Sequence, residues 1–180
     1  MQRFVAFLGG INVGGHRVKG PELAAEFTAL GFTDVATFLA SGNVVFSTED
    51  TVVAELTAGI EKQLEAALGY AVPTYLRTAD QVRHIAAHQP FPAADIAASR
   101  GKVQVALLAE PPAAAAQATA RELSSDQDRL AVDGTELYWL PSGGISESEL
   151  DLRTLFAALG PSTLRTVNTM RRITTKYLTD

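Results

Sequence analysis

Cysteine is absent from this sequence of 180 residues. The chain therefore cannot form a disulfide, a thiolate nucleophile, or a zinc or iron–sulfur site with cysteine ligands. Long apolar runs are missing as well. No segment approaches the roughly 20 apolar residues of a membrane span, and the run from Phe4 to Leu8 is too short for a signal peptide. We therefore expect a cytoplasmic protein without a membrane partner.

Basic side chains are scarce except at the two ends of the chain. Residues 1–20 carry three cations and no acid, and residues 161–180 carry four cations and one acid. Residues 21–160 hold eight basic and nineteen acidic side chains, within an overall charge of −5. A long nucleic acid would be repelled by this acidic middle, so the charge pattern favours a local anion site near the ends.

The first half of the chain has the element order β-α-β-β-α-β. Apolar periodicity, glycines and caps predict a strand at 3–8, a helix from Gly20-Pro21 to Gly31, strands at 35–39 and 44–47 around Ser41-Gly42-Asn43, a helix at 52–68 and a strand at 72–77. This is the order of the ferredoxin-like unit, in which two helices cover one face of a four-stranded antiparallel sheet.

The same order returns in the second half. After a helix at 79–88 and the break "QPFP", the sequence predicts a strand in "KVQVALLAE", a helix in "PPAAAAQATARELS", a hairpin turning at Asp133-Gly134, a serine-capped helix in "SESELDLRTLFAALG", a strand in "TLRTV" and a helix from Asn168. The predicted fold class is α+β, with two tandem ferredoxin-like units (α-β plaits) and a C-terminal helical tail. We expect unit 1 at 1–78, a helical linker at 79–100 and unit 2 at 101–180.

The glycine-rich loop "GGINVGGHRVKG" lies between the first strand and the first helix. Backbone N–H groups and the helix dipole can hold an anion at such a place. The spacing matches neither the phosphate loop of nucleotide hydrolases nor the dinucleotide-binding fingerprint, and the glycines can also simply turn the chain. The candidate ligand-binding residues are Asn12, Gly14, Gly15, His16, Arg17 and Lys19, with Arg171 and Lys176 of the basic tail as secondary members.

Other residues that carry chemistry have structural interpretations. His84 and His88 have the i, i+4 spacing of metal ligands, but no H-E-x-x-H pattern accompanies them, so we expect ordinary histidines, no metal and no cofactor. No G-x-S-x-G motif occurs, and Ser142-Gly143-Gly144 is typical of a loop. The acids of "SESELD" (Glu147, Glu149 and Asp151) are predicted to stabilise the start of a helix.

The second hairpin and the third strand bear on partners. Tyr138 and Trp139 are adjacent in a strand and point to opposite faces, which indicates packing between the two halves or coverage of both faces of the sheet. The third strand, "NVVFS", lacks the aromatic run with which RNA-recognition modules of this fold stack bases.

Four stretches resemble a known family. They are "FLGGINVGG", "ATFLASGNVVF", "ELYWLPSGGISESEL" and "NTMRRITTKYL". In this order they resemble the "LLRGINVGG", "TYxQSGNVVF", "LYLxxPEGxxxSxL" and "TTRNWNTVxKL" segments of the bacterial proteins grouped as domain of unknown function 1697. The resemblance implies two α-β plaits in tandem and no defined activity.

The sequence departs from that family at two places. Gly9-Gly10 stands where the family has Arg-Gly, and "MRRI" at 170–173 stands where it has "TRNW". Asn12, Gly14 and Gly15 match the family loop, and Arg171 aligns with the arginine of the tail. We also expect the glycine loop and the Ser41-Gly42-Asn43 turn to lie at opposite sheet edges, because strand three is taken to run parallel to strand one.

Four functional hypotheses follow. The first is binding of a small anionic ligand, phosphorylated or a nucleotide, at the glycine loop. The second is a nucleic-acid-binding module. The third is an enzyme without a recognisable motif that uses His16 as an acid or base, although the absence of a catalytic motif favours a protein that is not an enzyme. The fourth is a structural or protein-interaction module without a small ligand.

Overall fold

The computed structural model describes residues 1–179, which form two compact units. Unit 1 comprises residues 1–84 and the stretch from Ile173 onward, and unit 2 comprises Ile85–Arg172. The chain passes from one unit to the other within helix α3 (Ala79–Ala87) and within helix α7 (Val167–Tyr177). The domain boundaries expected from the sequence stay a prediction.

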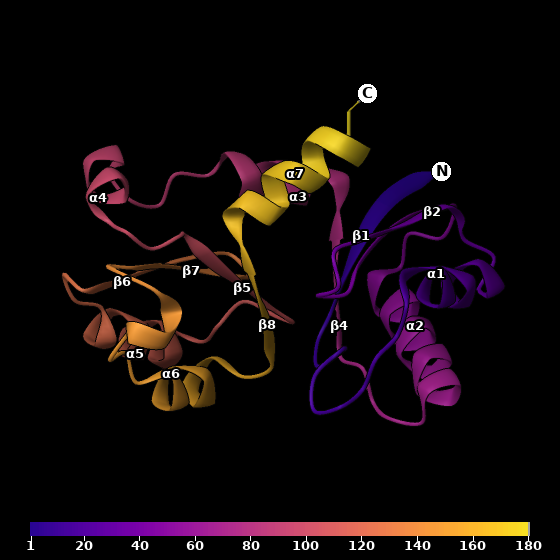
Figure 1. Ribbon diagram of the computed structural model, residues 1–180, viewed down its shortest axis with the longest axis horizontal. Helices are drawn as coiled ribbons and strands as arrows, with labels where there is room; N and C mark the ends of the chain where they lie inside the picture. Colours follow the sequence, from indigo (N-terminus) through magenta and orange to yellow (C-terminus); the bar gives the residue numbers. More distant parts are fainter. Residues whose placement is uncertain (180) are drawn as a thin grey trace. The chain divides into compact units, whose positions relative to one another are not determined.

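Unit 1 contains a four-stranded antiparallel sheet with the strand order β2-β3-β1-β4. Its elements are β1 (Gln2–Leu8), α1 (Gly20–Ala29), β2 (Thr33–Phe38), β3 (Asn43–Thr48), α2 (Val53–Leu68) and β4 (Thr74–Thr78). Figure 1 shows α1 and α2 on the same side of this sheet. The ferredoxin-like order predicted for the first half is confirmed.

The core of unit 1 lies between the sheet and its two helices. Every second side chain of β1 belongs to a buried cluster that also contains two residues of α1. The members are Phe4, Ala6 and Leu8 of β1 and Leu23 and Phe27 of α1, and all five are buried. The intervening Val5 and Phe7 are fully buried as well. A strand buried on both faces reads as a continuous apolar run, which explains the sequence "FVAFL".

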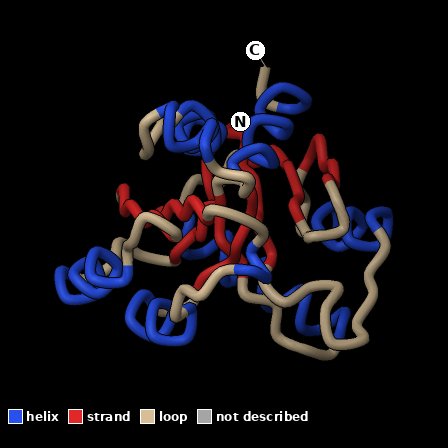
Figure 2. The backbone as a smooth tube through the Cα atoms, turned by 60° about the vertical axis from the view of Figure 1, so that its left-hand side comes forward, coloured by secondary structure: helices blue, strands red, loops and turns tan. Residues whose placement is uncertain are grey.

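Unit 2 repeats this architecture with the strand order β6-β7-β5-β8. Its elements are α4 (Ala93–Ala98), β5 (Gln104–Leu108), α5 (Ala114–Leu123), β6 (Asp128–Asp133), β7 (Glu136–Pro141), a 3₁₀ turn η1 (Ile145–Glu147), α6 (Leu152–Leu159) and β8 (Ser162–Thr166). Figure 2 distinguishes these helices and strands from the connecting loops. The predicted α+β fold with two similar sheets and a C-terminal helix is therefore confirmed.

The two units share a short sequence at their last strands. Leu-Arg-Thr occurs at 76–78 in β4 and again at 164–166 in β8. Arg77 pairs in register with Val5, and Arg165 pairs with Val105, so the two arginines hold equivalent places. Both are buried, and burial lowers the pKa of Arg165 to about 10.

The threonines of this repeat explain how the following helices begin. The Thr78 hydroxyl accepts the N–H of Gln81 at 3.2 Å, and the Thr166 hydroxyl accepts the N–H of Thr169 at 3.1 Å. Thr166 is therefore the cap of α7, and the start predicted at Asn168 is wrong. A hydroxyl on the last residue of a strand can accept the first free N–H groups of the helix that follows.

Two other boundaries differ from the prediction. Helix α6 begins at Leu152, because the Asp151 carboxylate, and not a serine, accepts the N–H of Thr154 at 3.0 Å. The upstream residues form η1, in which Glu147 accepts the N–H of Gly144. The second hairpin turns one residue later than expected, at 134–135, because Asp133 still pairs with Glu136.

Trp139 and its neighbour Tyr138 are both buried, with exposed fractions of 1% and 0%. The sheet of unit 2 is therefore covered on both faces at this point, one of the two possibilities expected from the sequence. The Trp139 indole N–H donates to the Asp128 carboxylate at 2.7 Å, so the polar end of this large side chain has a partner inside unit 2.

Candidate functional site

The glycine loop, residues 9–19 between β1 and α1, is held in shape by Asn12. The Asn12 Oδ1 atom accepts the N–H of Val18 at 2.6 Å, and its Nδ2 atom donates to the carbonyl of Ala40 at 2.8 Å. Asn12 itself has a left-handed backbone, with φ of 56°. Its amide therefore closes the loop and ties it to the β2–β3 turn, which makes Asn12 a positioning residue within this loop.

The expectation that the loop and this turn lie at opposite sheet edges is wrong. β1 and β3 are antiparallel, with Phe7 opposite Asn43, and the Leu8 N–H donates to the Gly42 carbonyl at 2.8 Å. A Cβ atom at Gly42 would overlap the Ile11 side chain. In a split βαβ unit β1 and β2 form the parallel pair, and β3 runs between them in the opposite direction. The end of β1 therefore meets the start of β3.

The tip of the loop is open. A Cβ atom added at Gly14 or Gly15, which have φ of 60° and 91°, would meet no heavy atom within 4 Å. Over residues 1–179, no protein acceptor faces the backbone N–H groups of Gly14, Gly15 and Arg17. The side chains of Arg17 and Lys19 are exposed. Backbone donors and cations are thus available together at this tip.

His16 lies on the same loop but is engaged by a neighbour. Its ring lies 3.9 Å from the Tyr70 ring, centroid to centroid, at an interplanar angle of 31°. Its backbone N–H donates to the Val13 carbonyl at 3.1 Å. The stacking fixes the imidazole on the residues that follow α2 and orients the loop beside it.

The N-terminus of α1 already has an anion of its own. The Glu22 carboxylate accepts the N–H of Lys19 at 3.1 Å, and Pro21 has no N–H to offer. The helix dipole is therefore satisfied within the chain, and the available donors lie at the loop tip. This differs from the sequence interpretation, which combined the loop with the helix dipole.

Lys176, predicted as a secondary member of the site, lies in unit 1. Its Nζ atom is 5.9 Å from the Phe38 ring centroid and 5.0 Å from that of Tyr177. The Tyr177 hydroxyl donates to the Thr37 carbonyl at 3.5 Å. Thr37 and Phe38 end β2, directly before the turn that Asn12 binds. Lys176 therefore lies at the same end of the unit 1 sheet as the glycine loop.

Arg171, the other predicted tail residue, belongs to unit 2. Its Nε atom donates to the carbonyl of Ala86 at 3.1 Å, near the end of α3. The guanidinium thus satisfies a carbonyl of the last turn of a helix, which otherwise has no partner within that helix. A structural role within unit 2 accounts for this side chain.

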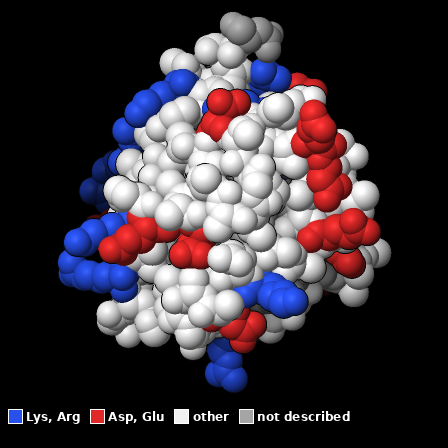
Figure 3. Space-filling model, turned by 90° about the vertical axis from the view of Figure 1, so that its right-hand side faces the viewer, with Lys and Arg blue, Asp and Glu red and all other residues white. Residues whose placement is uncertain are grey.

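Charges of both signs lie on the surface of unit 1. In the view of Figure 3 many basic side chains lie along the left edge and the largest groups of acidic side chains lie at the right, with mostly uncharged surface between them. The ion pair between Arg3 and Asp34, at 3.8 Å, is one place where opposite charges meet. The cations of the loop therefore act locally on this face.

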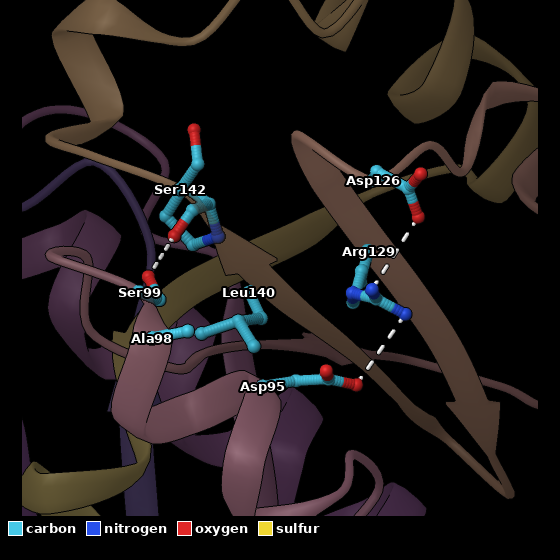
Figure 4. Close-up of a pocket in the computed structure, with 8 residues that line it drawn as sticks. Asp95, Ala98, Ser99, Asp126, Arg129, Leu140 and Ser142 are labelled. Atoms are coloured by element: carbon cyan, nitrogen blue, oxygen red, sulfur yellow. Dashed lines mark hydrogen bonds and ion pairs between the residues drawn. The ribbon is translucent and has the colours of Figure 1, made fainter.

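Unit 2 contains a second group of polar residues that the sequence interpretation took for a simple loop. Two cavities, of about 120 and about 360 Å³, flank Pro141 and Ser142 at the end of β7. In the smaller one, shown in Figure 4, Arg129 lies between Asp95 and Asp126, with ion pairs of 3.4 and 3.3 Å. The signal for this region was "PSGG" between a strand and a helix, a pattern too common to indicate a cavity.

His88 has a neighbour that the sequence pattern did not disclose. Its Nε2 atom lies 3.8 Å from the Asp133 carboxylate, and its ring lies 4.9 Å from the Tyr138 ring. Asp133 is far from His88 in the sequence and is brought there by the end of β6. The expectation that His84 and His88 bind no metal stays a prediction.

Comparisons with known proteins were consistent with the fold. The family described as Protein of unknown function (DUF1697) matches residues 1–138. The solved structure of conserved bacterial protein SP0830 from Streptococcus pneumoniae is 22% identical and covers 99% of each chain, with a TM-score of 0.78. No curated protein matches the chain. Within the described residues, every helix is too short or too polar to cross a bilayer.

Proposed function

Because the chain belongs to the DUF1697 family of proteins of unknown function, we propose from its own residues that it binds a small phosphorylated anion or nucleotide at the glycine loop. One observation carries the proposal. The N–H groups of Gly14, Gly15 and Arg17 have no acceptor among residues 1–179, and they lie beside the exposed cations of Arg17 and Lys19. Successive backbone N–H groups in a glycine-rich turn can form an anion-binding concavity.

Contacts within the chain hold the loop in shape, which supports this proposal. Asn12 fastens both ends of the loop, and the His16–Tyr70 stack holds its far side. A preorganised loop loses little conformational entropy on binding, so even a few charged contacts can give useful affinity. The glycines also leave the tip without Cβ atoms, so an anion can reach the backbone.

A small anion fits this geometry better than a long nucleic acid. The donors cover one loop tip, and residues 21–160 hold nineteen acidic and only eight basic side chains. A duplex would require cations spread along its backbone to release many counterions. His16 is held against Tyr70, and no catalytic step is assigned to it.

The proposal is tested by calorimetric titration and thermal unfolding with inorganic pyrophosphate and AMP as probes. The parent protein is compared with the double variant Arg17→Ala/Lys19→Ala. A double variant of two exposed cations elsewhere, Lys62→Ala/Arg121→Ala, is the charge-matched control. At about 100 times its dissociation constant a probe stabilises the folded state by roughly 2.7 kcal/mol, which raises Tm by several degrees.

We expect the probe to stabilise the parent and the control but not the loop variant. Equal stabilisation of all three proteins would refute the site, and so would no stabilisation of any of them. If a short DNA or RNA binds the parent instead, with an affinity that falls steeply with salt, the nucleic-acid hypothesis replaces this proposal.

A further inference from the structure

The larger of the two cavities beside Ser142 is lined by side chains of both charges. It measures about 360 Å³, at the lower end of the roughly 300–1,000 Å³ typical of small-molecule sites. Its lining includes the cation of Arg100 and the carboxylates of Asp128, Glu147 and Glu149. A cavity of this size with both signs of charge is suited to a ligand that also carries both.

The backbone around Arg100 is closely packed, so the guanidinium extends from a fixed position. The Arg100 N–H donates to the carbonyl of Ser142 at 3.0 Å, and the Ser142 N–H donates to the carbonyl of Gln127 at 2.7 Å. A Cβ atom at Gly101 would overlap the carbonyl oxygens of Pro141 and Gly143. These two chain segments therefore approach as closely as glycine permits.

Asp128 provides a buried and oriented carboxylate in the same cavity. Its side chain is only 5% exposed, and its Oδ1 atom accepts the indole N–H of Trp139 and the hydroxyl of Ser148, both at 2.7 Å. Both donors approach the same oxygen atom. They fix the plane of the carboxylate while it contributes to the lining of the cavity.

Arg100 has the opposite character. Its side chain is exposed, and within the described part of the chain no carboxylate oxygen lies within 4 Å of its guanidinium. Glu147 is nearby but is engaged with the Gly144 N–H at 3.2 Å. The guanidinium is therefore available to form a bidentate contact with a carboxylate brought by a ligand.

From these observations we infer that this cavity binds a small zwitterion, an α-amino acid or a dipeptide. The ligand carboxylate contacts Arg100, and its ammonium group contacts Asp128 with Glu149 beside it. Recognition requires both charged groups on one molecule, since the lining carries both a cation and carboxylates. This site is separate from the glycine loop and does not depend on the function proposed there.

The test is calorimetric titration of the full chain with a panel of L-amino acids and dipeptides. Ethylamine and propionate serve as ligands that carry only one of the two charges. The variant Arg100→Gln removes the carboxylate contact at an exposed position, so folding is preserved. Arg121→Gln, an exposed arginine on α5 of the same unit, is the matched control.

We expect at least one zwitterion to bind the parent, with affinity reduced about tenfold or more by Arg100→Gln and unchanged by Arg121→Gln. Ethylamine and propionate should each bind at least about tenfold more weakly than that zwitterion. The loop variant Arg17→Ala/Lys19→Ala should bind the zwitterion as the parent does. The inference is overturned if no panel member binds, if Arg100→Gln binds equally well, or if ethylamine alone binds as tightly.

Discussion

The two units share one fold but differ in the loops that connect their strands to their helices. In unit 1 the connection from β1 to α1 is the long glycine loop at 9–19, whereas its counterpart in unit 2, at 109–113, is short and contains two prolines. The connection that follows the third strand is instead short in unit 1 and long in unit 2. Residues 49–52 link β3 to α2 directly, while residues 142–151 connect β7 to α6, include η1 and contribute to the lining of the cavity beside Arg100.

This difference shows which parts of two units with the same fold can vary. The sheets, the helices on one face and the Leu-Arg-Thr strand end are common to both units. These parts bury apolar surface, so changes there reduce stability. The loops contribute little to the core and can diverge, which is why candidate sites occur in connections that do not correspond.

The largest effect is expected where a loop is packed against its strand. Gly42→Ala combines a left-handed backbone, with φ of 75°, with an overlap against Ile11, and it should lower the free energy of unfolding by about 3 kcal/mol or more. Gly14→Ala has a similar φ but open space, and should cost only about 1–2 kcal/mol. Urea unfolding of both variants measures the difference.

Gly101 of unit 2, in the segment before β5, is packed as closely as Gly42. Gly101→Ala should also be strongly destabilising, because a Cβ atom there would overlap two carbonyl oxygens. If Gly42→Ala or Gly101→Ala proved no worse than Gly14→Ala, the close packing that holds the two loops would be refuted.

A smaller effect is expected for the clamp of the glycine loop. Asn12→Ala removes the bonds to Val18 and Ala40 and should cost about 1–3 kcal/mol in unfolding free energy. It should also weaken binding of pyrophosphate, since the donors at the tip lose their preorganisation. Asn168→Ala, at an exposed position on α7, is the matched control and should change stability by at most about 0.5 kcal/mol. Equal stability of the two variants would contradict the role of Asn12.

The smallest effect is expected at the exposed cap of α6. The Thr154 N–H and hydroxyl hold the pKa of Asp151 below its ordinary value of 3.8. A folded-state pKa below the unfolded one means that this stabilisation is complete above pH 3.8 and is lost as the pH falls through the folded value. Asp151→Ala should therefore be less stable than the parent at pH 7 and nearly equal to it at low pH. If the difference in stability between Asp151→Ala and the parent did not change with pH, the capping role of the Asp151 carboxylate would be excluded.

Much of the fold follows from local patterns, while contacts between distant residues do not. The period of apolar residues predicted α2, and Gly69 marked its end, because periodicity and a left-handed glycine are local properties. The Asn12–Ala40 contact was missed because the direction of β3 was misjudged. The cavity beside Arg100 depends on segments from three parts of the chain, which no local pattern connects.

The most direct test of the central claim is an NMR titration of the ¹⁵N-labelled protein with inorganic pyrophosphate, which reports on each backbone N–H separately. We expect saturable shifts of the Gly14, Gly15 and Arg17 amide signals, while the amide signals of Ala109, Glu110 and Ala113 stay unchanged. Shifts confined to other parts of the chain, or no saturable shift at the loop tip, would contradict it.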